Sequence, residues 1–153
     1  MPNGSIIRLP FQPTEGISPS PVVVEGAALS ALLQWKPRVS EAYTVVCPDG
    51  RLKRARLTAL TDSSATLVVF EDMDSTESSL EVTLLQALPE KERMELVIQK
   101  TTELGVSTIV PFKSDKSTSL EEREAKQKKS GRWAAVALRA AKQCRRESLV
   151  RIL

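Results

Sequence analysis

Residues 81–112 constrain the fold more than any other stretch, because they fit a strand, a helix and a second strand in succession. Residues 81–88 alternate and end apolar, which predicts a mostly buried strand. Pro89 suits the first position of a helix, and the apolar residues that follow recur at helical spacing until Gly105 ends it. Residues 106–112 then form another apolar strand. Two strands joined through one helix lie parallel with a right-handed crossover, so we expect an α/β unit here.

The first half of the chain has a different pattern. Residues 1–25 contain five prolines, which disfavour a helix before a short strand at 22–25. The following segments predict a helix at 26–35 and short strands at 43–47, 52–60 and 66–70, with a hairpin turn at Pro48-Asp49-Gly50. Strands and turns at this spacing indicate a small antiparallel barrel, closed so that no edge is exposed.

Between these parts lies an acidic, polar segment, EDMDSTESS at residues 71–79. It has almost no apolar anchors, which is typical of a linker. We therefore predict an α+β protein of two domains, with a barrel at residues 1–72, a linker at 73–79 and part of an α/β domain at 80–153.

The net charge of +3 is unevenly distributed. Residues 113–153 carry 12 Lys and Arg against 5 Asp and Glu, whereas residues 1–80 carry 7 against 9 and residues 81–112 carry 3 against 5. A basic segment of this kind favours an anionic partner, most commonly nucleic acid. The alternative interpretation is a charged helix that is simply solvated.

Composition excludes several classes of site. The chain has no histidine, so catalytic triads that need one, HExxH metal sites and Cys/His zinc fingers are all excluded. Its two cysteines, Cys47 and Cys144, are far apart and indicate reduced thiols and no metal site. No apolar run approaches the roughly 18 residues of a membrane span, and the N-terminus lacks a signal-peptide pattern. We expect a cytoplasmic protein.

Four cations cluster on the predicted hairpin, and two of them, Arg54 and Arg56, share one face by the two-residue period of a strand. The cluster comprises Arg51, Lys53, Arg54 and Arg56. These side chains either hold RNA phosphates or keep an outer barrel face soluble, and the sequence favours neither interpretation.

A polar loop, KSDKSTS, follows the second strand of the α/β unit. In open α/β sheets ligands bind at the carboxyl ends of the strands, which makes Lys113, Lys116, Ser117 and Thr118 candidate substrate contacts. An ordinary surface loop is the alternative. The next segment, residues 120–129, is highly charged and fits a helix.

From Arg132 the pattern predicts a long amphipathic helix whose apolar stripe includes Trp133. Beside that stripe a second set of side chains falls within a sector of roughly 80°, with Gln143 at its border. This set comprises Arg132, Arg139, Lys142 and Arg146. A line of cations next to a buried face suits an RNA backbone, where each neutralised phosphate releases counterions.

The sequence of the second half resembles that of one protein family. LLQALPEKERMELVIQKTTELGVSTIVPF, then DKS, then RWAAVALRAAKQCRR resemble in order and spacing the motifs of the RsmE family of ribosomal RNA (uracil-N3) methyltransferases. That resemblance covers about half the chain. The IIRLPF and EGAALSALLQW segments lie where that family carries a PUA-like RNA-binding domain.

The resemblance implies a PUA-like barrel joined to a SPOUT methyltransferase domain. It further implies a homodimer that methylates N3 of one uridine in 16S ribosomal RNA with S-adenosylmethionine as donor. By motif position, the residues implied in substrate contact or site architecture are Lys100, Glu103, Lys116, Gln143 and Arg146.

The chain departs from the family pattern at a few positions. Glu90 replaces a lysine, Lys116 replaces an arginine and so lacks its planar fork, and the usual histidine is absent. In this family the methyl donor sits in a C-terminal knot with a GPEGG-like loop, and no glycine follows Gly131 here. We therefore expect the N-terminal part of such an enzyme, with the cofactor bound beyond Leu153. A non-catalytic RNA-binding module and a protein-interaction domain are the alternatives.

Overall fold

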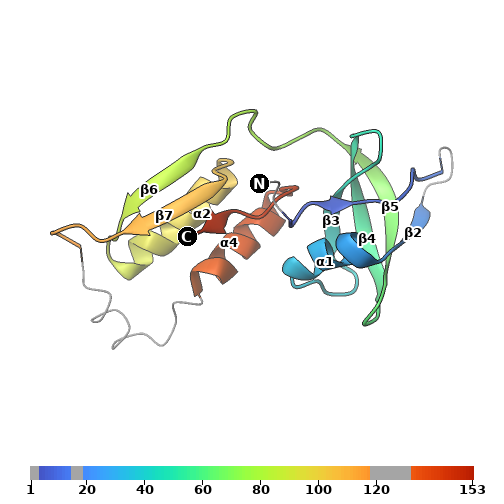
Figure 1. Cartoon of the computed structure of the whole chain (residues 1–153), viewed down its shortest axis with the longest axis horizontal. Coiled ribbons are helices and arrows are strands. Elements are labelled where there is room, and N and C mark those ends of the chain that lie inside the picture. The colour runs from blue at the N-terminus through green and yellow to red at the C-terminus, as the bar shows by residue number, and fades with distance from the viewer. Residues whose placement is uncertain (1–3, 15–18, 118–131) are drawn as a thin grey trace. The chain divides into compact units, whose positions relative to one another are not determined.

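The computed structural model describes residues 4–14, 19–117 and 132–153, and their contacts divide into two compact units. The first unit comprises Met1–Thr76 with Arg145–Ser148, and the second comprises Glu77–Cys144 with Leu149–Leu153. The elements of the first unit are β1 (Ile7–Arg8), β2 (Ser20–Val24), α1 (Gly26–Gln34), β3 (Ala42–Val46), β4 (Leu52–Leu60) and β5 (Ala65–Met73). Those of the second are β6 (Thr83–Ala87), α2 (Lys91–Glu103), β7 (Thr108–Phe112), α4 (Arg132–Gln143) and β8 (Arg151–Ile152) (Figure 1).

The first unit is a strongly curled five-stranded sheet in the order β1-β3-β4-β5-β2 (Figure 1). The predicted helix and strands are present, but the expectation of a closed, purely antiparallel barrel is wrong. β1 pairs with β3 in parallel, and the sheet order ends at β1 and β2 without a ladder between them among the described residues. β1 has only two residues and carries no periodic pattern, so the sequence did not predict it.

One face of this sheet packs on α1 and forms the first core. Trp35 at the end of α1 is only 3% exposed, its indole Nε1–H donates to the Ser5 carbonyl oxygen at 2.7 Å, and its ring meets Tyr43 edge-on with centroids 6.3 Å apart. A buried indole needs such an acceptor because an unpaired N–H is costly away from water. Trp35 therefore fixes the N-terminal segment and β3 to α1.

The predicted hairpin turn between β3 and β4 is confirmed. The Gly50 N–H donates to the Cys47 carbonyl oxygen at 2.9 Å, and the Cys47 N–H donates to the Arg51 carbonyl oxygen at 2.9 Å. Gly50 has a φ of +84°, a left-handed conformation that glycine adopts without strain.

The acidic segment at residues 71–79 is not all irregular, because β5 continues through Glu71 and Asp72 to Met73. Asp72 pairs across the ladder with Lys53 and Glu71 with Arg54. Opposite charges on facing strand positions stabilise a ladder that the acidic composition of the segment alone disfavours. The strand therefore extends beyond the residues whose side chains are apolar.

The second unit confirms the predicted α/β arrangement. Its three strands lie parallel in the order β6-β7-β8, and α2 and α4 lie together on one face of that sheet (Figure 1). Two successive right-handed crossovers in the same direction require this placement. The Gly105 N–H donates to the Thr102 carbonyl oxygen at 3.2 Å, so Gly105, with φ at +92°, ends α2 as expected. The shared core contains Met94, Ile98, Ile109, Ala137 and Val150.

The expectation of a mostly buried strand at residues 81–88 is wrong. β6 is an edge strand, and within it Leu84 packs against the core whereas Leu85 is 68% exposed. Successive strand residues point to opposite faces, and only one face of this sheet carries helices α2 and α4. The apolar residues of this run therefore lie on both faces of β6, and the described residues cover only one of these faces.

Trp133 is half-buried against the second core rather than enclosed by it. Replacing Trp133 with alanine should therefore lower the free energy of unfolding by about 2 kcal/mol, less than the ~3–5 kcal/mol of a fully buried tryptophan. Urea denaturation followed by far-UV circular dichroism measures this. A loss below about 0.5 kcal/mol is the result for a surface side chain and contradicts the packing described.

Both cysteines are free thiols, Cys47 buried and Cys144 half-buried. Within residues 4–14, 19–117 and 132–153, no helix combines the length and apolar character needed to cross a membrane.

Candidate functional site

Helix α4 forms the predicted apolar stripe and presents part of the predicted line of cations. Ala137, Ala140 and Ala141 are buried, and Arg132 and Arg139 are exposed. The Arg132 guanidinium lies 3.4 Å from a Glu95 carboxylate oxygen on α2. The prediction that α4 has one buried face is confirmed.

Arg146 does not belong to this line of cations. α4 ends at Gln143, and Arg145 has a φ of +58°, which turns the chain out of the helix before Arg146 is reached. Arg146 is only 3% exposed and is part of the first unit. The helical projection placed it beside Arg139 because it assumed a helix one turn longer.

Lys100 and Glu103 lie together on α2. Lys100 Nζ donates to Glu103 Oε2 at 2.8 Å, and Gln99 Nε2 donates to the other carboxylate oxygen at 3.0 Å. The hydrogen bond from Lys100, followed by that from Gln99, holds the pKa of the Glu103 carboxyl below its usual range. The pair is thus a charge-neutral cluster near the C-terminus of α2.

The loop after β7 is a closed turn. The Ser117 N–H donates to the Ser114 carbonyl oxygen at 2.9 Å, and the Ser114 N–H donates to Ser117 Oγ at 3.0 Å. This turn leaves Lys113 and Lys116 exposed at the carboxyl end of β7. The candidate contact Thr118 and the predicted helix at 120–129 lie outside the described residues.

The predicted site residues of the second unit fall at two ends of its sheet. α2 and α4 run opposite to the strands, so Arg132 at the start of α4 lies toward the carboxyl end, as Lys116 does. Lys100, Glu103 and Gln143, at the ends of their helices, lie toward the amino end. The structure therefore places these predicted site residues in two groups at opposite ends of the sheet rather than in one site.

Three of the four hairpin cations have partners in the first unit. Arg51 and Lys53 form ion pairs, and Arg54 forms hydrogen bonds that are described below. Arg51 Nε lies 2.5 Å from an Asp49 carboxylate oxygen, and Lys53 forms an ion pair with Asp72. Hydrogen bonds from the backbone N–H and then the side chain of Arg51 lower the pKa of Asp49, and the bond from Lys53 lowers that of Asp72.

Arg54 shares a face with Arg56, as predicted, but it is buried at 9% exposure. Its guanidinium donates to Thr44 Oγ1 at 3.1 Å and to the Ala42 carbonyl oxygen at 2.8 Å. Thr44 Oγ1 in turn donates to the Arg145 carbonyl oxygen at 2.8 Å, so residues 145–148 lie over this part of the sheet. Burial, followed by the charge of Arg145, lowers the pKa of Arg54.

Arg56 remains exposed and lies over the ring of Phe70, with its Cζ 5.6 Å from the ring centroid. Phe70 was not among the predicted site residues, because a phenylalanine in an apolar strand pattern normally packs inward. The signal was local: Phe70 directly precedes the acidic Glu71 and Asp72, where the strand leaves the core.

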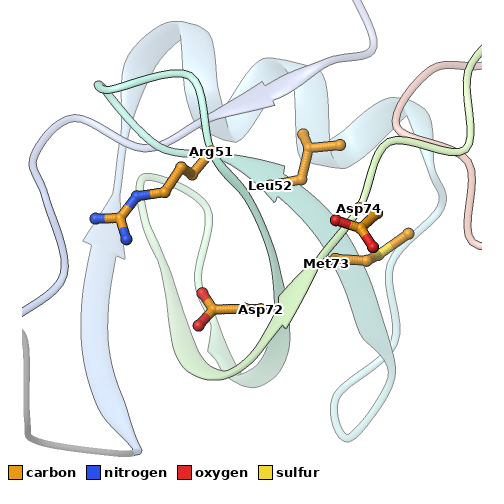
Figure 2. Close-up of a pocket in the computed structure, with 5 residues that line it drawn as sticks. All are labelled: Arg51, Leu52, Asp72, Met73 and Asp74. Carbon is orange, nitrogen blue, oxygen red and sulfur yellow. The ribbon is translucent and has the colours of Figure 1, made fainter.

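A pocket of ≈ 410 Å³ opens at the start of β4 and the end of β5. Figure 2 shows Leu52, Met73 and Asp74 on one side of the opening, with Arg51 and Asp72 extending to the other. Its lining carries two carboxylates against one guanidinium, and that guanidinium is held by Asp49. The pocket therefore does not favour a polyanion such as RNA.

The parallel sheet, the two helices on one of its faces and the exposed cations on α4 all lie in a part of the chain that a protein-family model matches. Residues 76–153, half of the chain, match the model of the RNA methyltransferase domain. The chain therefore belongs to the RNA methyltransferase domain family.

Curated relatives specify this class further. The chain is 29% identical over 120 residues to ribosomal RNA small subunit methyltransferase E of Bacillus subtilis (strain 168), a match that covers 76% of this chain and 46% of that protein. It is 34% identical over 76 residues to the protein of the same name from Buchnera aphidicola subsp. Acyrthosiphon pisum, covering 50% and 30%. The resemblance to the RsmE family is confirmed. The chain spans less than half the length of these relatives.

Solved structures agree. Ribosomal RNA small subunit methyltransferase E from Neisseria gonorrhoeae, bound to S-adenosyl methionine, superimposes with a TM-score of 0.53 at 26% identity, covering 97% of this chain and 61% of that one. A putative methyltransferase from Legionella pneumophila, in complex with the cofactor SAM, gives 0.52 at 25%, covering 96% and 61%. The mixed α/β fold, with a curled sheet and a parallel sheet, is therefore the fold of these methyltransferases.

Proposed function

We propose that the protein to which this chain belongs methylates N3 of a uridine in 16S ribosomal RNA, with S-adenosylmethionine as methyl donor. The observation that carries the proposal is the match of residues 76–153 to the RNA methyltransferase domain, supported by relatives named small subunit methyltransferase E.

In this proposal the two parts of the chain have different tasks. Residues 1–72 act as a PUA-like RNA-binding domain, residues 73–79 as a linker, and residues 80–153 as the first part of a SPOUT domain that works as a homodimer. The curled sheet of the first unit and the parallel sheet of the second support this division.

The described residues suit the RNA better than the cofactor. S-adenosylmethionine carries a sulfonium cation, whereas the carboxyl end of β7 presents the ammonium groups of Lys113 and Lys116. The turn carries these two cations against the single carboxylate of Asp115, so its net positive charge repels a sulfonium and attracts phosphates. The residues present thus do not fit a cofactor site, and we assign this chain the binding and positioning of RNA.

We propose that Lys116, Arg132 and Arg139 contact RNA phosphates. Lys116 and Arg132 lie toward the same end of the sheet, and Arg139 is exposed two turns along α4 from Arg132. Lys100, Glu103 and Gln143, toward the other end, are proposed to support the architecture of the site. For Arg146 and Arg54, burial supports a structural role in place of RNA contact.

Replacing Arg139 with glutamate should weaken binding of a 16S ribosomal RNA fragment and reduce the slope of log affinity against log salt by about 1, because one phosphate contact is lost. Filter binding over a salt series measures both quantities. Arg38→Glu is the matched control, since Arg38 is an exposed cation of the first unit to which no RNA contact is assigned, and the change in net charge is the same. Equal losses in the two variants assign the effect to overall charge and contradict a contact by Arg139.

A non-catalytic RNA-binding module is the second candidate, favoured by the poor fit of the described residues to a sulfonium. Calorimetric titration of this 153-residue chain with S-adenosylmethionine addresses the cofactor assignment. We expect no measurable binding, and tight binding would falsify the inference that the residues of this chain do not form the cofactor site.

A further inference from the structure

The outer face of the first unit presents an aromatic side chain, Phe70, beside a bulge in β5. The β4–β5 register runs Lys53↔Asp72 and Arg54↔Glu71, and then resumes at Ala55↔Val69, so Phe70 is the β5 residue with no partner in that ladder. Side chains alternate between the two faces of a strand. Phe70 therefore points outward next to the buried Val69, and it is 38% exposed.

Arg56 covers part of this ring and differs from the other hairpin cations. Arg51 and Lys53 are held by carboxylates, and Arg54 is buried among hydrogen-bond acceptors. Arg56 lies on the phenyl face of Phe70, 5.6 Å from its centroid. A guanidinium stacked on a ring is pre-oriented and keeps its N–H groups along the plane for phosphate oxygens.

The neighbours of Arg56 along the strand row carry no negative charge, and the carboxylate of Glu71, which follows Phe70, lies 3.7 Å from the Arg145 guanidinium. Arg56 faces Ala42 on β3 and Val68 on β5, and Val68 faces Pro21 on β2. These neighbours are neutral, so the row offers apolar surface and one cation. Single-stranded nucleic acids bind such surfaces, because bases stack on aromatic rings while cations follow the backbone.

We propose that Phe70 and Arg56 form a stacking platform for an unpaired RNA base, with the Arg56 guanidinium contacting an adjacent phosphate. The proposal rests on the proposed function, since it names the RNA contact of the first unit. Of the four hairpin cations, for which the sequence left RNA contact and a solvated face as alternatives, it assigns RNA contact to Arg56 alone and adds the ring of Phe70. Charge complementarity favours RNA over an apolar protein partner, which would leave Arg56 desolvated without an acceptor.

Fluorescence anisotropy with labelled single-stranded oligouridine, and with the same strand annealed to oligoadenylate, tests the platform in this chain. Phe70→Ala should weaken single-strand binding about five-fold to a hundred-fold, the range of one lost base stack, and leave duplex binding unchanged. Phe70→Trp should bind the single strand as well as the unaltered chain does, because it keeps an aromatic ring at this position. Arg56→Gln should weaken binding and reduce the salt slope by about 1.

Matched controls lie in the same unit. Phe11 is an exposed phenylalanine with 52% exposure, and Arg51 is an exposed arginine already paired with Asp49. Phe11→Ala and Arg51→Gln should bind like the unaltered chain, and an unchanged urea midpoint in every variant excludes unfolding as the cause. If the unaltered chain binds the single strand and Phe70→Ala binds it equally well, the platform is wrong while the proposed function stands. If the unaltered chain binds neither oligouridine nor a 16S ribosomal RNA fragment, RNA binding by this chain and the platform both fail.

Discussion

Replacing Trp35 with alanine should lower the free energy of unfolding of the first unit by about 3–5 kcal/mol, the loss typical of a buried tryptophan. The side chain is 3% exposed and makes two specific contacts, a hydrogen bond to the Ser5 carbonyl oxygen and an edge-on contact with Tyr43. Urea denaturation measures the change. The chain has only two tryptophans, and the remaining one, Trp133, lies in the second unit, so the unfolding of the first unit is followed by far-UV circular dichroism.

Trp35→Phe separates the two contributions. It keeps an aromatic ring on Tyr43 and removes the N–H donor, so we expect a loss of about 1–3 kcal/mol from the missing hydrogen bond to the Ser5 carbonyl oxygen and from the smaller ring. A loss as large as that of the alanine variant contradicts the role given to ring packing. No loss in either variant contradicts the burial of Trp35.

Replacing Ile98 with alanine should destabilise the second unit by about 2–5 kcal/mol. Ile98 is fully buried on α2 and lies in the same cluster as Met94 and Ile109. Trp133 packs against that cluster, so its fluorescence during urea denaturation reports the change directly. Leu96→Ala is the control on the same helix, because Leu96 is 53% exposed and should change stability by less than about 0.5 kcal/mol. Similar losses at both positions show that α2 does not bury the face described.

The sequence predicted the α/β unit closely because its signals are local. The helical spacing before Gly105, and the apolar strands on either side of it, specify a parallel pair whatever surrounds them. The hairpin around Gly50 was predictable for the same reason, since a turn of this kind depends on a few adjacent residues.

Features that depend on distant partners were not predictable. The ladder that extends β5 to Met73 depends on Lys53 and Arg54, about twenty residues earlier. The pairing of β1 with β3 and the exposure of Leu85 depend on which elements lie alongside each strand.

The site was predictable only in part, for the same physical reason. Arg132 and Arg139 are exposed on α4 as their helical positions predict, whereas Arg146 follows a turn at Arg145 that the periodicity does not show. Arg54 and Arg56 share a face as predicted, but residues 145–148 cover only one of them. Phe70 points outward by the alternation of side chains along β5, which is a local signal, whereas the bulge beside it is a property of two strands in register rather than of one sequence segment.

The most direct test of the proposed function is a methyl-transfer assay with the full-length protein. Small-subunit ribosomal RNA is incubated with the protein and isotopically labelled S-adenosylmethionine, digested to nucleosides and separated by liquid chromatography with mass detection. We predict label in 3-methyluridine. Label in a different nucleoside contradicts the proposed position of methylation, and no label in RNA under conditions where the protein binds it contradicts the proposed activity.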